Sequence, residues 1–111
     1  MNKIADIKRK RKWAHGKLLE LKSPVYQAYL EMEAATFREG ALSKQAKELI
    51  AVGISVVINC ESCMQWHVEK AVEAGASELE ILEAIEVGME MGGGPATASA
   101  RFALEVMEEL H

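Results

Sequence analysis

Apolar residues recur along this chain at the three- and four-residue spacing of helices, and alternating strand patterns are nearly absent. The first apolar stripe predicts an N-terminal helix, and its residues are Ile4, Ile7, Ala14, Leu18 and Leu21. Ser23-Pro24 combines an N-cap with a proline in the first turn, which predicts a second helix that stops at Gly40.

A third helix is predicted from Lys44 to about Asn59, capped by Ser43. Its interior is the most apolar part of the chain (49–52 and 54–58), so we expect it to be the buried central helix. The β-branched run near its end is compatible with a strand in isolation. The continuous length and the cap favour a helix.

Three more helices are predicted downstream. The fourth runs from about Cys60 to Ala74, with Gly75 as its stop. Ser77 and Glu80 form a capping-box pattern for the fifth helix, and the sixth starts at Pro95 after a glycine triplet, 92–94. The residues expected to face inward on these last two helices are Leu79, Leu82, Ile85, Met89, Phe102, Val106 and Leu110. Six short helices with short turns predict an all-α bundle.

The length of 111 residues fits a single small domain with a thin core. No apolar run approaches the roughly 20 residues of a membrane span, and no apolar segment of a secretory signal follows the basic N-terminus. We therefore expect a cytoplasmic protein with no membrane partner. In that setting a Cys-x-x-Cys pair is typical of catalysis or metal binding rather than of a structural disulfide.

Charge is unevenly distributed. Residues 1–22 hold eight Lys/Arg against two acids, a balance of +6, and residues 23–111 hold five against fifteen, a balance of −10. We accordingly expect a basic N-terminal helix or arm, 1–22, and a helical domain, 23–111. The basic run 8–12 could meet nucleic acid, but no aromatic residues interleave with it and the acidic remainder repels a polyanion. We expect a solvated helix face, or an arm lying on the acidic part of a neighbouring subunit, and no nucleic-acid partner.

The candidate chemistry lies in Cys60, Cys63 and His67, a C-x-x-C-x-x-x-H run that contains the only two cysteines. At the start of a helix these positions share one stripe, and the helix N-terminus favours a thiolate. The imidazole can act as base for the neighbouring sulfur. Ser62 can donate a hydrogen bond but cannot act as a base near neutral pH.

Glu48 is the candidate third member of this site. If the chain reverses near Asn59, the third and fourth helices lie antiparallel and bring Glu48 within one turn of the position opposite His67. A carboxylate there would hold the tautomer of the ring and support its role as base. Alternatively, Glu48 is a boundary residue paired with Lys44 or Lys47.

The segments 41–51 and 59–67, which contain Glu48, Cys60, Cys63 and His67 in this order, resemble the carboxymuconolactone decarboxylase family, and within it the alkylhydroperoxidase D-like branch. The segment 91–95 is similar to the glycine-rich turn of the family, and the resemblance spans about residues 25–110. It implies an all-helical fold assembling as homotrimers or homohexamers, with antioxidant, peroxiredoxin-type peroxidase or disulfide-reductase activity. It also implies that the cysteines are the redox pair and that His67 and Glu48 relay protons. Hydroperoxidase members often carry a second histidine where Ser62 stands.

The expected mechanism begins with attack of Cys63 on a peroxide and continues with disulfide formation by Cys60, although the two sulfurs could exchange roles. The expected partners are the peroxide and a dithiol reductant, either lipoyl, thioredoxin-like or a small thiol; no cofactor is expected. Three other functions stay open: zinc binding by the two cysteines, His67 and Glu48; non-catalytic redox sensing; and lactone decarboxylation, whose family members generally lack the cysteine pair.

The remaining candidates are expected to be structural. Trp66 lies one position off the stripe and is assigned to packing, and His15 to a solvated position in the basic arm. The methionines assigned to helix interiors are Met32, Met64, Met89, Met91 and Met107.

Overall fold

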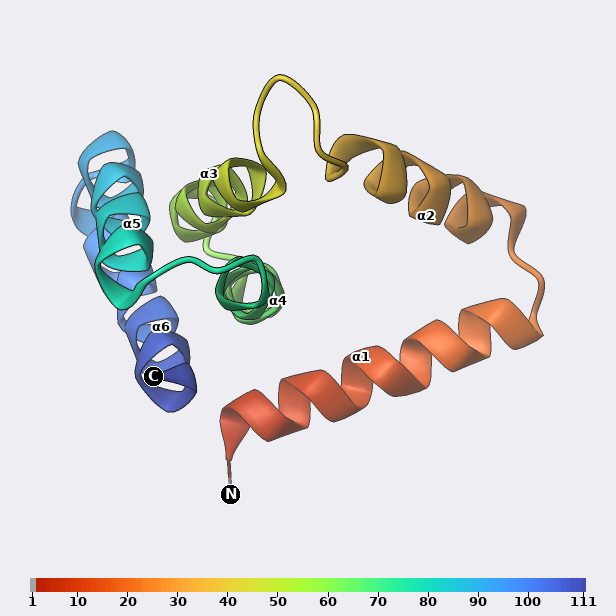
Figure 1. Ribbon diagram of the computed structural model, residues 1–111. Helices are drawn as coiled ribbons and strands as arrows, with labels where there is room; N and C mark the ends of the chain where they lie inside the picture. Colours follow the sequence, from red (N-terminus) through yellow and green to blue (C-terminus); the bar gives the residue numbers. More distant parts are fainter. Residues whose placement is uncertain (1) are drawn as a thin grey trace. The chain divides into compact units, whose positions relative to one another are not determined.

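The computed structural model describes residues 2–111, and all regular structure in them is helical (Figure 1). The helices are α1 (Lys3–Glu20), α2 (Pro24–Thr36), α3 (Lys44–Val57), α4 (Glu61–Glu73), α5 (Glu78–Gly92) and α6 (Gly94–Leu110). The predicted all-α fold with its six helices is confirmed for this part of the chain.

Serine caps set three of the predicted helix starts. The Ser23 and Ser43 hydroxyls accept the backbone N–H groups of Tyr26 and Ala46, and Ser77 forms a complete capping box with Glu80. The prediction that α2 continues to Gly40 is wrong, because the helix ends at Thr36. There the Thr36 hydroxyl donates to the Met32 carbonyl at 2.7 Å, and such a side-chain bond competes with the continuing helix.

The chain divides into two compact units, Met1–Glu39 with α1 and α2, and Gly40–His111 with α3 to α6. In the first unit, His15 Nδ1 lies 2.5 Å from the Tyr26 hydroxyl, and the Tyr26 ring stacks on Tyr29. Although its side chain is exposed, His15 therefore joins α1 to α2, which the expectation of a simply solvated residue did not anticipate.

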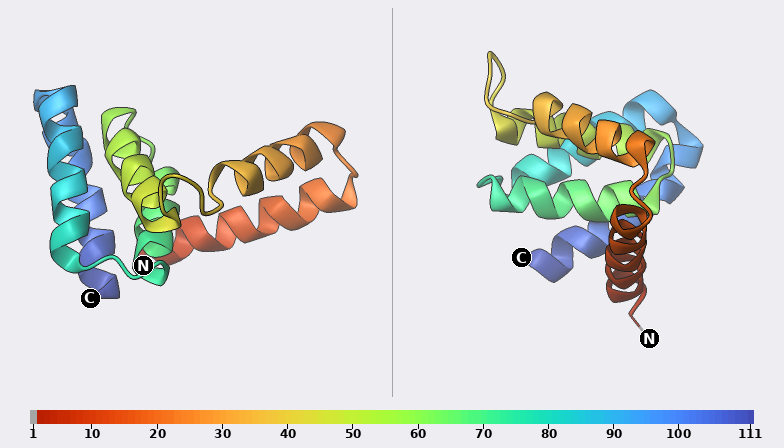
Figure 2. Two further views of the ribbon diagram at one scale, coloured as in Figure 1. Left: turned by 45° about the horizontal axis from the view of Figure 1, so that its top comes forward. Right: turned by 90° about the vertical axis from the view of Figure 1, so that its right-hand side faces the viewer.

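The second unit contains most of the apolar core. Figures 1 and 2 show α3 and α4 beside the α5–α6 pair, and each pair runs back on itself through a short turn. Each of the four helices α3 to α6 contributes two large buried side chains: Val52, Val56, Met64, Val68, Ile81, Ile85, Phe102 and Val106. Inward positions were thus predicted correctly for Ile85, Phe102 and Val106.

Several apolar positions that were expected to be buried are exposed. Leu79 is 66% exposed, and Met32 and Met91 also face solvent. The expectation that the third helix is a buried central helix does not hold for one of its faces, because Ile50, Ile54, Val57 and the C-cap residue Ile58 are exposed. Helical periodicity identifies apolar stripes, but only the partner helices decide which stripe is covered.

Glycines bring α3 and α5 into close contact. A Cβ atom at Gly88 of α5 would lie 2.6 Å from the Gly53 carbonyl oxygen of α3, and one at Gly53 would lie 3.1 Å from the Ala84 carbonyl oxygen. Neither position has room for a side chain without movement of the backbone. This contact holds α3, the helix that carries Glu48, against the rest of the bundle.

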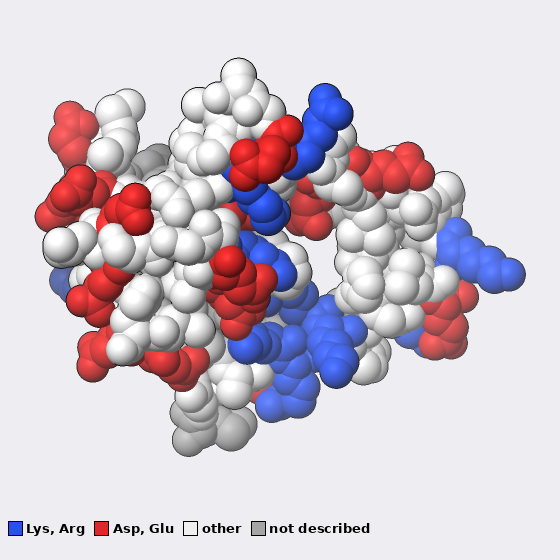
Figure 3. Space-filling view, in the orientation of Figure 1, with Lys and Arg blue, Asp and Glu red and all other residues white. Residues whose placement is uncertain are grey.

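The charge on the surface follows the pattern expected from the sequence. Acidic side chains spread over the region of Figure 3 where α5 and α6 lie in Figure 1, and α5 itself carries five glutamates and no basic residue. Within residues 2–111, no helix combines the length and apolar character required to span a bilayer.

Candidate active site

The turn between α3 and α4 places both cysteines. Asn59 adopts a left-handed backbone (φ 54°), and its N–H donates to the Val56 carbonyl at 3.3 Å. The Cys60 N–H donates to the Ser55 carbonyl at 3.0 Å. These two bonds form a Schellman motif that ends α3. The break at this position was predicted, whereas the left-handed residue was not, although asparagine tolerates that conformation better than most residues.

Cys60 closes the turn after α3 through its N–H and caps the start of α4. It is the N-cap of α4 rather than its first residue, which corrects the expected start of the helix by one position. Its Sγ accepts the Cys63 backbone N–H at 3.1 Å. A disulfide joins Cys60 to Cys63 with their Cα atoms 5.2 Å apart, and both residues are partly exposed. When the bond is reduced, the Cys60 sulfur lies where helix N–H groups favour a thiolate.

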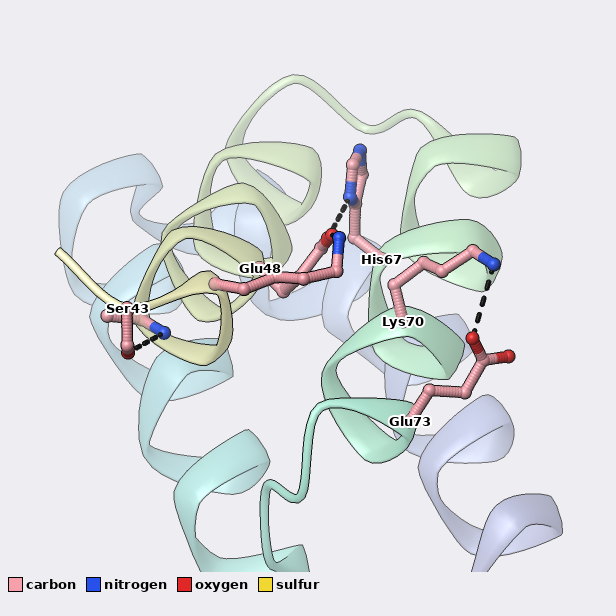
Figure 4. A network of polar contacts seen from close by, with 7 residues as sticks. Ser43, Glu48, His67, Lys70 and Glu73 are labelled. Atoms are coloured by element: carbon pink, nitrogen blue, oxygen red, sulfur yellow. Dashed lines mark hydrogen bonds and ion pairs between the residues drawn. The ribbon is translucent and has the colours of Figure 1, made fainter. Parts of the chain in front are cut away.

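Glu48 and His67 form the predicted contact between α3 and α4. Glu48 Oε1 lies 2.7 Å from His67 Nδ1, with side chains only 3% and 16% exposed. Figure 4 shows the two side chains pointing toward each other from neighbouring helices, with the other ring nitrogen directed away from the carboxylate. An ionised carboxylate can only accept, so Nδ1 carries the hydrogen and Nε2 keeps the lone pair. The ring is thereby oriented as a base.

His67 follows Cys63 by four residues within α4, so both side chains lie on the same face of the helix. This four-residue spacing thus places the oriented imidazole and the Cys63 sulfur on the same side of α4. Cys60 is supported differently, by the Cys63 N–H at the helix terminus. The two sulfurs therefore have distinct environments: one beside a base and the other at a positive helix end.

Glu48 also pairs with Lys44. The Lys44 Nζ lies 3.4 Å from Glu48 Oε2, so the lysine contact that the sequence offered as an alternative to the histidine contact occurs together with it. One buried carboxylate therefore receives a cation on one oxygen and an imidazole on the other. The sequence indicated each partner separately but not their simultaneous contact.

Trp66 contributes packing and a cation contact beside this site. Its side chain is half-buried, and Lys70 Nζ lies 4.4 Å from the centre of its ring. Lys70 also pairs with Glu73 at 3.2 Å, one turn further along α4 (Figure 4). This cation is therefore directed along α4 rather than to Glu48.

The zinc alternative requires at least three ligand side chains to lie together. Across residues 2–111, no three His, Cys, Asp or Glu side chains gather as metal ligands. In the disulfide, neither Cys60 nor Cys63 has a thiolate to offer. Ser62 is exposed in the first turn of α4 and provides no second imidazole.

Comparisons with known proteins point to one family. The model of the carboxymuconolactone decarboxylase family matches residues 23–106. Uncharacterized protein 4 in the cox locus of Paracoccus denitrificans is 38% identical over 108 residues, which cover 96% of this chain and 97% of that protein. An uncharacterized protein of Cupriavidus necator is 36% identical over 80 residues, 72% of this chain and 70% of its own length.

Solved structures share the whole fold. The crystal structure of apo-lpg0406, a carboxymuconolactone decarboxylase family protein from Legionella pneumophila, aligns with a TM-score of 0.93 at 30% identity and covers 99% of this chain and 98% of its own. TM1620 from Thermotoga maritima aligns with a TM-score of 0.86 at 28% identity and covers 95% and 89%. TM1620 is described as a family protein with a possible part in an antioxidative response.

Proposed function

This chain belongs to the carboxymuconolactone decarboxylase family, and we propose that it is a thiol-dependent peroxidase that reduces hydroperoxides with Cys60 and Cys63. The observation that carries this proposal is the 2.7 Å contact between the buried Glu48 carboxylate and His67, four residues after Cys63. A disulfide alone would suit a structural role. A disulfide beside an oriented base suits redox turnover.

In the first step, His67 Nε2 takes the proton of the Cys63 thiol, and the thiolate attacks the outer oxygen of the hydroperoxide. The S–O bond forms as the O–O bond breaks, which oxidises the sulfur to a sulfenic acid. The imidazolium returns its proton to the departing alkoxide, so the product is an alcohol. Glu48 stabilises the imidazolium through Nδ1 during this exchange.

In the second step, the Cys60 thiolate attacks the Cys63 sulfenic sulfur. The new S–S bond displaces hydroxide, which leaves as water with the proton that Cys60 released. The overall reaction converts one hydroperoxide and two thiols into an alcohol, water and the disulfide. An external dithiol (lipoyl, thioredoxin-like or a small thiol) then restores both thiols by exchange and is itself oxidised.

The antioxidative role suggested for the Thermotoga maritima protein agrees with this proposal. Ser62 sets a limit on it, because the site has one imidazole rather than two and the serine cannot share the proton transfer. We therefore propose moderate peroxidase turnover.

A peroxidase assay coupled to dithiol oxidation tests the proposal with wild type, His67→Gln and Cys63→Ser. His67→Gln is expected to slow turnover about 100-fold or more, the usual contribution of a positioned base. Cys63→Ser should abolish turnover, and Ser62→Ala, an exposed neighbour, should leave it unchanged. Equal rates for wild type and His67→Gln would refute the assigned base.

Titration of free thiols separates this function from redox sensing. A peroxidase consumes many equivalents of peroxide per protein while dithiol is present, whereas a sensor consumes one. Trapping the sulfenic acid in Cys60→Ser identifies Cys63 as the attacking sulfur. A sulfenic acid that forms only on Cys60, in Cys63→Ser, would reverse the assigned roles.

We also propose that the protein self-associates through the exposed apolar face of α3, which consists of Ile50, Ile54, Val57 and Ile58. These residues recur at helical spacing, and four large aliphatic side chains on one face form a patch typical of an interface. We propose that another copy of this chain covers this face, within a trimer or hexamer. Light scattering after size exclusion should give a multiple of the chain mass for wild type and a smaller species for Ile54→Lys. A monomeric wild type would contradict this assembly.

A further inference from the structure

The Glu48 carboxylate is held at both oxygens although its side chain is only 3% exposed. His67 Nδ1 lies 2.7 Å from Oε1, and Lys44 Nζ lies 3.4 Å from Oε2. Burying a carboxylate is costly unless its charge and lone pairs are matched. The lysine, whose own side chain is 45% exposed, brings a permanent positive charge to this carboxylate, whereas the imidazole is charged only when protonated.

The position of Lys44 in the helix disfavours a merely structural role. It is the first residue of α3, where the positive end of the helix dipole opposes a cation, and the first turn contains no acidic residue. The pair also has the weaker order for helix stability, with the lysine N-terminal to the glutamate. Local helix energetics therefore do not explain a lysine at this position, whereas its contact with the buried carboxylate does.

We propose that Lys44 is a positioning residue of the peroxidase site, an inference that rests on the proposed function. By holding Oε2, Lys44 keeps the Glu48 carboxylate turned so that Oε1 faces His67 Nδ1. That contact keeps the hydrogen on Nδ1 and the lone pair on Nε2, the nitrogen that serves Cys63. Lys44 thus acts on the reacting sulfur only indirectly, through the side chains of Glu48 and His67.

The test compares Lys44→Met, Lys44→Arg and Lys17→Met in the reduced protein. Lys17 is the matched control, because its side chain is 46% exposed and pairs with Glu20 at 3.6 Å, three residues along α1. Sulfenic acid formation after peroxide addition should slow about three- to tenfold in Lys44→Met, since a half-exposed ion pair is weak and acts indirectly. Lys44→Arg should restore the rate to within about twofold, and Lys17→Met should not change it.

The second readout is the nitrogen-15 spectrum of His67, which distinguishes a ring protonated at Nδ1 from one protonated at Nε2. Lys44→Met should reduce the Nδ1–H population, and Lys44→Arg should retain it. An unchanged His67 spectrum in Lys44→Met overturns the inference, whether or not the melting temperature falls. An unchanged peroxide rate in an active protein overturns it as well. If wild type shows no peroxide turnover, the proposed peroxidase function fails, and the spectrum still decides whether Lys44 orients the ring.

Discussion

Gly88→Ala is expected to destabilise the helical bundle, although alanine is the better helix former. Gly88 lies in α5 where that helix crosses α3, and an added Cβ would stand 2.6 Å from the Gly53 carbonyl oxygen. The same Cβ would lie 3.1 and 3.3 Å from two atoms of the Val56 side chain. Ordinary contacts of a Cβ begin at 3.4 Å, so the overlap with the backbone oxygen is about 0.8 Å.

The change in the free energy of unfolding is the difference between two opposed contributions. Replacing glycine by alanine within a helix gains about 1 kcal/mol. Overpacking a closed core costs about 1–3 kcal/mol, and the upper part of that range applies because the clash is with backbone rather than with a flexible side chain. The net loss is about 1–2 kcal/mol, which corresponds to a fall in melting temperature of about 5–15 °C for a unit of this size.

Urea unfolding and thermal melting, both followed by circular dichroism, measure this change. Gly16→Ala is the matched control, because Gly16 lies inside α1 with nothing within 4 Å of an added Cβ. It should raise the stability of α1 by up to about 1 kcal/mol, seen as slower amide exchange in that helix. The two substitutions are therefore expected to change stability in opposite directions. A Gly88→Ala variant as stable as wild type would refute the close contact between α3 and α5.

Three further predictions concern the buried carboxylate of the site, the turn after α3 and an ion pair on α1. Glu48→Gln should slow sulfenic acid formation at least about tenfold while keeping the fold, and Glu48→Ala should also lower the melting temperature, as rate assays and melting curves will show. Asn59→Ala should cost about 1 kcal/mol in urea unfolding because of its φ of 54°, whereas Asn59→Gly should not. The hydrogen bond from Lys10 lowers the pKa of the Asp6 carboxyl below 3.8, so the stability that this pair adds is complete above that pH and is lost as the pH falls through the lowered value. Carbon-13 NMR titration should find the Asp6 midpoint closer to 3.8 in Lys10→Ala.

The site illustrates how far local patterns reach. The i, i+4 relation of Cys63 to His67 follows from the sequence alone, because both lie within one helix. The contact of His67 with Glu48 required only one additional assumption, a reversal at Asn59, and the Schellman motif there provides it. The double contact of Glu48 was not anticipated, because the sequence alone presents Lys44 and His67 as competing partners. Both contacts are possible because a carboxylate has two oxygens, and each oxygen accepts one partner.

The sequence by itself determined the helices, their serine caps and the common face of the reactive side chains, because these depend on spacing and hydrogen bonds within a few residues. The tertiary structure decided which apolar stripes are covered, so that Val52 and Val56 are buried while Ile54 and Val57 of the same helix are exposed. It also decided the approach of α3 to α5 and the burial of the Glu48 charge. These properties depend on how helices distant in sequence pack against one another, and helical periodicity carries no information about the partner.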